Sequence, residues 1–338
     1  MSAVLLDTAG GTDRHAVGPP GAGRPRRPRR PIRTSLRRRL TVLSFIGPAL
    51  AGLAIFFVYP LLASVYFSFH RVDLINPPQW IGLANWRFLF HDLNLRHAAG
   101  NTLWFVVVMV PARVVGAMVT AMLLNRIRRG RSVYRTLFYL PALAPPVVAT
   151  LAFVSLLKPG TGPVNTLLAK VGIDPPLWFS SPVWAKPALV LLALWGIGDL
   201  MIIFVAALLD VPTELYEAAA LDGANAWQRF RSVTLPTISP VVLFAAVTGV
   251  IATLQYFTQA AVAASVASGE AITGGGIAGT FGYPEGSTYT YPLWLYSVGF
   301  RSGLLGYSSV LAVVLFLVAI SVTLVLLRRF RAFAGSAG

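Results

Sequence analysis

The sequence has no cysteine, only four histidines and few charged residues. Charged residues fill 12% of its 338 positions, whereas soluble domains carry about 25%. Without cysteine the chain forms neither disulfides nor thiolate metal sites. The histidines show no metal-ligand spacing, and no nucleophile–base or carboxylate pair is recognisable, so we expect no metal site and no catalytic residue.

Long apolar windows account for the missing charge. Six of them are long enough to cross a bilayer, which takes about 20 residues. Four carry no charge, whereas the second contains Arg113 and the fourth contains Asp199. We therefore expect an all-α integral membrane domain over residues 40–327 with six transmembrane helices, in the windows Leu40–Phe69, Ala98–Leu124, Thr136–Leu157, Pro187–Leu209, Thr237–Val266 and Ser302–Leu327.

Lysine and arginine predict the orientation, because they are retained on the cytoplasmic side. Twenty lie in residues 1–39, 126–135, 210–236 and 328–338, and seven lie in the opposite loops. We therefore expect both termini, including the tail 328–338, to be cytoplasmic. The net charge of +16 follows the ends of the apolar windows, which argues against nucleic-acid binding.

The leader, residues 1–39, is rich in arginine, proline and glycine, and we expect it to be disordered. We interpret it as a topology anchor. Contact with anionic lipid and a twin-arginine export signal at "SLRRRLTVL" are alternatives. The apolar run that follows is longer than a signal-peptide core, so cleavage is not expected.

The external loops carry their own patterns. The stretch "NPPQWIGLANWRFLF" predicts a turn and a short helix at the membrane interface. The loop after the third window is broken by proline and glycine and predicts one short helix near Asn165–Lys170. The stretch "SGEAITGGGIAGTFGYPEGSTYTYPLW" predicts a long flexible loop, a length that favours an external partner.

The cytoplasmic loop 210–236 contains a predicted helix–turn–helix elbow. Asp210 is expected to cap the first helix, with Pro212 in its first turn. Asp222-Gly223 is expected to end that helix, because glycine takes the left-handed position after a helix. Leu235-Pro236 is expected to break the chain before the next window. From these residues alone, the elbow is either an interfacial hairpin or a docking element.

The second helix of the elbow is expected to begin at a cap, Asn225, and to carry an apolar face. Trp227, Phe230 and Val233 are spaced by three and so share that face.

The same string resembles the EAA signature of binding-protein-dependent ABC importer permeases. It has Glu217-Ala218-Ala219, then Gly223, then Val233-Thr234-Leu235-Pro236, with valine where the signature has isoleucine. Further segments resemble the carbohydrate branch, and within it the first permease subunit of the maltose and glycerol-phosphate type. They are "WIGLANWRFLF", "RTLFYLPALAPPVVA", "PGTGPVNTLL", "ITGGG" and "GYSSVLAVVLFL".

The resemblance implies a type I ABC importer permease fold in a bacterial plasma membrane. It implies as partners a second permease, an ABC ATPase dimer, an extracytoplasmic solute-binding protein, membrane lipid and a sugar. It also implies that the elbow sits in a groove of the ATPase, through Glu217, Ala218, Ala219, Leu221, Asp222, Gly223, Trp227, Phe230, Leu235 and Pro236. The chain lacks GxxxxGK[ST], so we expect it to bind no cofactor, with ATP and Mg²⁺ on the partner.

Two departures from the family's pattern bear on the solute. Phe257-Thr258 stands where members often have Phe-Asp, and Asp199 stands where they are more often apolar or amide. The resemblance therefore does not name the sugar, and an ABC permease for a non-sugar solute is an alternative.

Polar residues inside the windows are candidates for the substrate pathway. Gln255 and Gln259 are four residues apart and are expected to share a helix face beside Tyr256; Trp195 and Asp199 have the same spacing. Amides, a carboxylate and aromatic rings suit a sugar. Hydrogen bonding between helices is the alternative for all of them, and Asp199 has a second alternative in pairing with Arg113.

Two other classes of protein fit less well. A self-contained channel or ion-coupled transporter needs several intramembrane charges, and the windows hold only Arg113 and Asp199. A membrane-embedded enzyme calls for histidine or paired carboxylates at depth, and the windows hold one aspartate and no histidine.

Overall fold

The computed structural model describes residues 36–73, 75–127, 129–269 and 280–335. The chain divides into two units, one ending at Ala54 and the other beginning at Ile55. Helices dominate the described residues, and their only sheet is a short antiparallel hairpin in which His70 pairs with Trp80.

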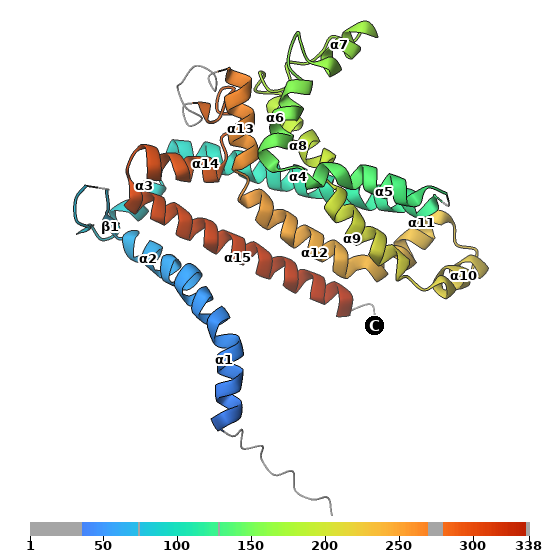
Figure 1. Ribbon diagram of the computed structural model, residues 1–338, viewed down its shortest axis with the longest axis horizontal. Helices are drawn as coiled ribbons and strands as arrows, with labels where there is room; N and C mark the ends of the chain where they lie inside the picture. The colour runs from blue at the N-terminus through green and yellow to red at the C-terminus, as the bar shows by residue number, and fades with distance from the viewer. Residues whose placement is uncertain (1–35, 74, 128, 270–279, 336–338) are drawn as a thin grey trace, which may run out of the picture. The chain divides into compact units, whose positions relative to one another are not determined.

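The helices and strands follow one another in the order coloured in Figure 1. They are α1 (Leu36–Leu53), a π-helical turn (Ala54–Val58), α2 (Tyr59–Phe67), β1 (His70–Arg71), β2 (Gln79–Trp80), α3 (Ala84–Leu89), α4 (Leu93–Arg126), α5 (Arg131–Tyr139), a 3₁₀ turn (Leu140–Leu143), α6 (Pro146–Leu156), α7 (Pro163–Lys170), α8 (Ala185–Trp195), α9 (Gly198–Leu209), α10 (Thr213–Leu221), α11 (Ala226–Arg229), a π-helical turn (Phe230–Thr234), α12 (Leu235–Leu254), α13 (Thr258–Ser268), α14 (Tyr291–Tyr296), a π-helical turn (Ser297–Arg301) and α15 (Leu305–Gly335).

Four helical stretches in the described ranges are long and apolar enough to cross a membrane: Thr41–Phe67, Leu93–Arg126, Ala226–Leu254 and Leu305–Arg329. Two helix pairs pass the same test together but are bent. The bend is 102° between Arg131–Leu143 and Pro146–Leu156, and 50° between Ala185–Trp195 and Gly198–Leu209. Counting each bent pair as one span gives the six spans that the sequence predicts.

Three windows are not the straight helices that their apolar length suggested, and one of them is the fourth, which has the 50° bend between α8 and α9. The third window bends at Ala144 and Pro145, because Pro145 and Pro146 remove two consecutive backbone donors. The fifth window splits, since α12 ends at Leu254 and a separate helix starts at Thr258. At this break the hydroxyl of Thr290 donates to the carbonyl of Tyr256 at 2.8 Å, so a distant residue satisfies the freed backbone group.

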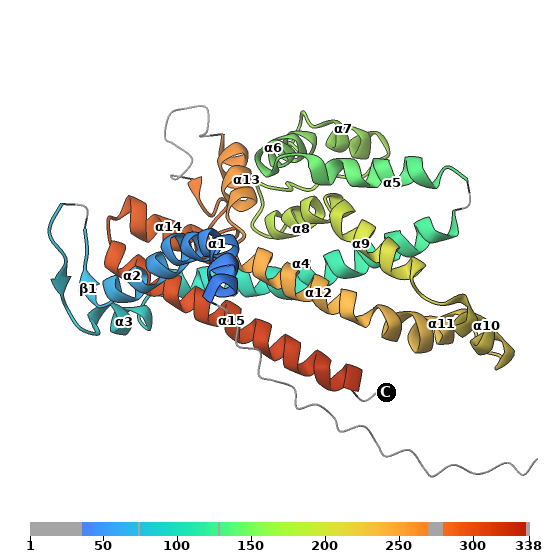
Figure 2. The ribbon, with the colours of Figure 1, turned by 60° about the horizontal axis from the view of Figure 1, so that its bottom comes forward.

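The core of the second unit lies between α4, α9, α12 and α15. α4 packs against α9 and α12, and α12 packs against α15, as the two views in Figures 1 and 2 show. Fully buried Met201 and Phe204 of α9 lie in this cluster with Ala117 of α4 and Ile238 of α12. A second cluster joins α4 to α6, α8 and α13 and contains Phe105. The two clusters hold the bent pairs against α4.

A buried carboxylate ties the start of α4 to α14 and α15. Asp92 caps α4 by accepting the N–H of Leu95 at 3.1 Å. Its other oxygen accepts the indole N–H of Trp294 and the hydroxyl of Tyr307, each at 2.7 Å. Three hydrogen bonds satisfy this 5% exposed residue, as a buried charge requires.

The short helices predicted for the external loops are confirmed, as α3 and α7. Of the long glycine-rich loop, residues 270–279, including "ITGGG", lie outside the described residues. In its described part Thr288 and Thr290 are buried and hydrogen-bonded to backbone carbonyls, so this part is not the flexible segment that we expected. Residues 1–35 of the leader also lie outside the described residues, and α1 begins at Leu36.

The orientation of the spans is a prediction with a direct test. The chain has no cysteine, so single cysteines report on one position each. Thr161, between α6 and α7, and Arg231, in the π-helical turn before α12, are both exposed. We expect an impermeant maleimide to label Thr161→Cys in intact cells and Arg231→Cys only after permeabilisation. The reverse pattern would show that the orientation is inverted.

Candidate functional site

The first helix of the elbow, α10, runs from Thr213 to Leu221 without a side-chain cap. The predicted cap is wrong: Asp210 ends the preceding helix α9, where its N–H bonds to the carbonyl of Ala206. Pro212 occupies the N-cap position of α10 in an extended conformation. Since α9 continues to Leu209, Asp210 lies too far upstream to reach the free N–H groups of α10.

Gly223 ends α10 with a left-handed residue, as predicted, at a φ of +76°. The N–H of Ala224 bonds to the carbonyl of Ala219 at 2.9 Å, and that of Gly223 bonds to Ala220 at 3.1 Å. This pair of bonds is a Schellman motif. A Cβ added at Gly223 meets nothing within 4 Å, so in the chain by itself the backbone conformation, and not packing, disfavours a side chain here.

The second helix of the elbow begins at a capping box, so the predicted cap Asn225 is confirmed. The N–H of Gln228 bonds to the Asn225 side chain at 2.9 Å, and the N–H of Asn225 bonds to the Gln228 side chain at 2.8 Å. The expected break at Leu235-Pro236 is wrong, because helix runs without interruption from Ala226 to Leu254. Pro236 directly follows the π-helical turn Phe230–Thr234, where the regular α-helical hydrogen-bond pattern is already interrupted.

Contacts within the elbow connect its two helices, and the elbow exposes apolar side chains. The hydroxyls of Tyr216 and Thr234 share a hydrogen bond of 2.8 Å that joins α10 to the π-helical turn. The Trp227 and Phe230 rings stack at a centroid distance of 5.4 Å. Leu221 is 90% exposed and Trp227 is 67% exposed. The described part of the chain does not cover these two side chains, a feature typical of interaction surfaces.

The other predicted elbow residues differ in their exposure. Glu217, Ala218, Asp222 and Pro236 are exposed, and Ala219, Phe230 and Leu235 are half-buried. Glu217 forms no ion pair within the described residues.

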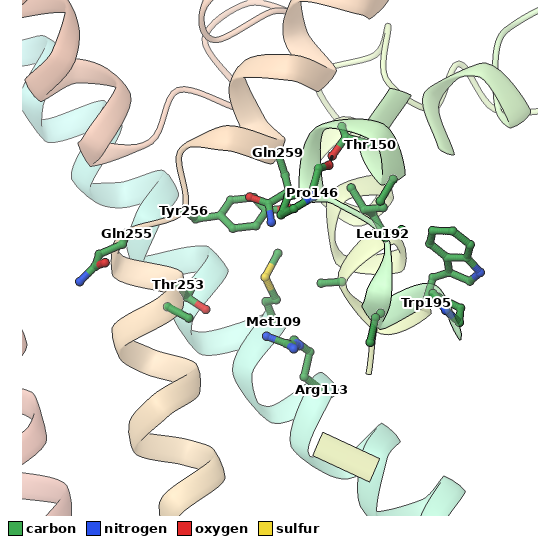
Figure 3. Close-up of a pocket in the computed structure, with 17 residues that line it drawn as sticks. Met109, Arg113, Pro146, Thr150, Leu192, Trp195, Thr253, Gln255, Tyr256 and Gln259 are labelled. Carbon is green, nitrogen blue, oxygen red and sulfur yellow. Dashed lines mark hydrogen bonds between the residues drawn. The ribbon is translucent and has the colours of Figure 1, made fainter. Parts of the chain in front are cut away.

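A cavity of about 370 Å³ opens where three helix breaks meet α4. The bend between α5 and α6, the bend between α8 and α9, and the break between α12 and α13 form its walls. Figure 3 shows Arg113 and Met109 of α4 below the space that Tyr256, Gln259 and Pro146 border. The polar residues that line the cavity are Arg113, Thr150, Trp195, Thr253, Gln255, Tyr256 and Gln259.

Four of the five predicted pathway residues line this cavity, although the helix geometry used to predict them is wrong. Gln255 and Gln259 do not share one helix, because the chain breaks between them, and a 50° bend separates Trp195 from Asp199. The break and the bend bring them together instead. In Figure 3, Gln259 and Tyr256 lie near the centre, whereas Gln255 and Trp195 extend to opposite sides.

The fifth predicted residue, Asp199, lies outside the main cavity. It lines a smaller adjoining cavity of about 150 Å³ together with Arg113. An Asp199 oxygen is 3.7 Å from a terminal nitrogen of Arg113, so the pairing left open by the sequence is present. Arg113 lines both cavities.

Sequence reasoning missed Arg113 as a cavity residue, together with Met109, Thr150 and Thr253. A cation inside an apolar window was the available signal, because intramembrane charges usually face a cavity or a partner. The other three residues carry no such signal, since methionine and threonine are common in buried helices.

Residues 112–332 match the model of a protein family described as "Binding-protein-dependent transport system inner membrane component". This chain belongs to that family. As an inner-membrane component it is a multi-pass membrane protein, in agreement with its apolar helices. The family is one of transport components, and the matched region contains the end of α4, the elbow and all lining residues of the main cavity except Met109.

Two curated relatives of this inner-membrane component cover most of its length. One is the probable ABC transporter permease protein YesP of Bacillus subtilis, 35% identical over 87% of this chain and 92% of its own. The other is the lactose transport system permease protein LacF of Rhizobium radiobacter, 33% identical over 80% of this chain and 87% of its own.

Solved structures show the same fold. A bacterial ABC transporter involved in the import of the acidic polysaccharide alginate contains a chain with a TM-score of 0.70, at 21% identity over 88% of this chain and 96% of that one. A second structure, of a bacterial alginate ABC transporter with a pentasaccharide-bound periplasmic protein, has a TM-score of 0.71 at the same identity and coverage. The inner-membrane component therefore has the fold of an ABC importer permease.

Proposed function

We propose that this chain is a permease subunit of an ATP-driven carbohydrate importer. It forms the solute pathway with a second permease, receives solute from an extracytoplasmic binding protein, and is coupled to a separate ATPase dimer that binds ATP and Mg²⁺. The proposal rests on the elbow of this chain. The elbow lies within the region that matches the transport family, and it exposes Leu221 and Trp227 between two membrane helices. ATP hydrolysis resides in the partner, and this chain is a transport subunit without catalytic residues.

The relatives support a carbohydrate as the solute. Besides the lactose permease, they include a sulfoquinovosyl glycerol permease from Agrobacterium fabrum and a trehalose/maltose permease from Thermococcus litoralis, at 32% and 28% identity. The main cavity suits a sugar, because it combines amides with aromatic rings. Its volume of about 370 Å³ falls in the usual range for small-molecule pockets, about 300–1,000 Å³.

The elbow supports coupling through its stiffness. ATP-driven closure of soluble subunits has to move membrane helices as rigid bodies. The Tyr216–Thr234 hydrogen bond and the uninterrupted helix from Ala226 to Leu254 connect the exposed ring of Trp227 to the break at Gln255 without a flexible joint. A displacement of the elbow is therefore transmitted to the wall of the main cavity.

The proposal is tested by purifying the chain from its native membrane with its bound partners. We expect a second permease and an ATPase to co-purify, and the binding protein loaded with saccharides to stimulate ATP hydrolysis in proteoliposomes. Stimulation by amino acids or inorganic ions alone would point to a non-sugar solute. Uptake without any ATPase would contradict the assignment and favour a self-contained transporter.

Replacing Gln259 with alanine is expected to lower saccharide uptake about tenfold, because one amide hydrogen bond to the solute is worth up to about 1.5 kcal/mol. Gln255→Ala is the matched control and is expected to lose less, since its amide extends away from the centre of the cavity (Figure 3). Uptake kinetics in proteoliposomes measure both. Equal, wild-type rates in the two variants would remove both glutamines from the pathway.

A further inference from the structure

Arg113 is the only charged side chain among the described residues that line the main cavity. It lies 13 residues before Arg126, the end of α4, which places it about 20 Å along the helix axis from that end. A cation at this depth is costly unless it has a partner or faces a water-filled cavity. In the described part of the chain, no carboxylate lines the main cavity to compensate it.

The ion pair of Arg113 with Asp199 satisfies the guanidinium poorly. The closest approach is 3.7 Å, beyond hydrogen-bond distance, and the buried Nε of Arg113 has no hydrogen-bond partner within the described chain. Asp199 is held elsewhere, because the same oxygen accepts the N–H of Leu200 at 2.7 Å. Its side chain is also 60% exposed in the chain by itself, so the pair is not enclosed by the surrounding helices.

The two cavities meet at Arg113, so a group in either cavity can contact this side chain. Asp199 occupies the smaller cavity, and the described lining of the larger one presents Gln259, Tyr256 and Thr150 but no anion. A guanidinium offers five donors in a planar fork that matches a carboxylate or a similar oxyanion. With one loose partner on one side, most of these donors are free to bind a ligand on the other.

We propose that the solute of this transporter is a saccharide with an anionic group, such as a uronate, sulfonate or phosphate, and that Arg113 binds this group in the main cavity. In the empty cavity Arg113 forms only the long ion pair with Asp199. When the solute binds, its anionic group replaces Asp199 as the partner of Arg113. This inference rests on the proposed function and goes beyond it by assigning the charge of the solute.

The test uses the purified complex with its second permease, ATPase and binding protein in proteoliposomes. The probes are disaccharide pairs matched except at one carbon, such as cellobiouronic acid and cellobiose, with a C6 phosphate and a C6 sulfonate as further arms. We expect anionic members to be imported in preference to their neutral counterparts. The rates of the uronate, sulfonate and phosphate arms then distinguish the three sources of the anion.

Variants locate this preference in the cavity. Arg113→Gln is expected to lower import of the anionic saccharide about tenfold or more, as loss of a charge-assisted hydrogen bond predicts, and to change import of a neutral saccharide much less. For Arg113→Lys we expect import of the anionic saccharide at a rate between those of the wild type and Arg113→Gln, because lysine keeps the charge but lacks the planar guanidinium donors. Saccharide affinity of the isolated binding protein, which lacks Arg113, is the control and stays unchanged.

A double variant separates this role from a purely structural one. If Arg113 serves only to neutralise Asp199, Arg113→Gln combined with Asp199→Asn restores import, which would overturn the inference. Import of neutral saccharides alone, or an equal loss for neutral and anionic ones in Arg113→Gln, would overturn it too while leaving the carbohydrate importer intact. If no saccharide of either kind is imported, the proposed function fails together with the inference. If Arg113→Gln does not assemble, the import rates of anionic and neutral saccharides by the wild-type complex and by Arg113→Lys still test the inference.

Discussion

Replacing Gly223 with valine is expected to reduce solute-stimulated ATP hydrolysis to the unstimulated rate, while the chain stays in the membrane. The φ of +76° is strained for any residue with a Cβ, at a cost of roughly 1–2 kcal/mol. Relief of that strain changes the angle between α10 and α11 and so moves Leu221 relative to Trp227. A surface that has to fit the ATPase then loses its shape. Hydrolysis and ATPase co-purification are the two readouts.

The chain offers a matched control in Gly172, at the end of α7. It has a φ of +80° and open space around an added Cβ, and its neighbour Ile173 makes the same type of backbone bond, to Leu168 at 3.0 Å. Gly172→Val therefore has a similar local cost, but we expect it to retain ATPase binding. Gly223→Asn is expected to be milder, since asparagine tolerates the left-handed region. Equal effects at both glycines would show that only folding is disturbed.

The second large effect is expected at Gly198, the first residue of α9. A Cβ there would overlap the carbonyl oxygen of Phe138 and would lie 2.7 Å from the Cα of Tyr139. Both atoms belong to the backbone, so a side chain rotation cannot relieve the clash. Gly198→Ala has to separate α9 from α5, at a cost of about 1–3 kcal/mol, and Gly198→Val costs more. We expect a lower thermal stability in detergent and loss of transport.

The control for Gly198 lies two residues away. A Cβ at Gly196 meets nothing closer than 3.9 Å, so Gly196→Ala is expected to keep wild-type stability. Both glycines lie at the bend between α8 and α9, but only a Cβ at Gly198 would meet the backbone of α5. Wild-type melting temperature and uptake in Gly198→Ala would show that the two bent pairs are not packed as described.

The sequence predicted what is decided within a few neighbouring residues. Gly223 and Asn225 act through backbone groups a few positions away, and both were assigned correctly. Asp210 and Pro236 were not, because their roles depend on whether the adjacent long helices continue. α9 does continue to Leu209, and helix also passes through Pro236 into α12. The roles of Asp210 and Pro236 therefore depend on how far the neighbouring helices extend, and not on the turn preferences of the residues themselves.

The cavity shows a different limit. The break that places Tyr256 and Gln259 depends on Thr290, whose hydroxyl bonds to Tyr256 from 34 positions away. No local pattern signals such a contact, so the sequence predicted a continuous helix, whereas these residues line the cavity because the helix is broken. It also singled out Arg113 and Asp199 as intramembrane charges, but which cavity each of them faces depends on the bend between α8 and α9.

The central claim is that the elbow connects this chain to its ATPase, and the stacked rings of Trp227 and Phe230 test it most directly. The measurement is solute-stimulated ATP hydrolysis by the complex that co-purifies with Trp227→Ala/Phe230→Ala. The control is Phe69→Ala/Trp80→Ala, another stacked pair, in which Trp80 is 68% exposed and the ring centroids are 5.7 Å apart. We predict that the elbow variant loses both the ATPase and the stimulation, whereas the control keeps the ATPase. Wild-type ATPase binding and stimulated hydrolysis in the elbow variant would contradict the claim and leave the elbow as an interfacial hairpin.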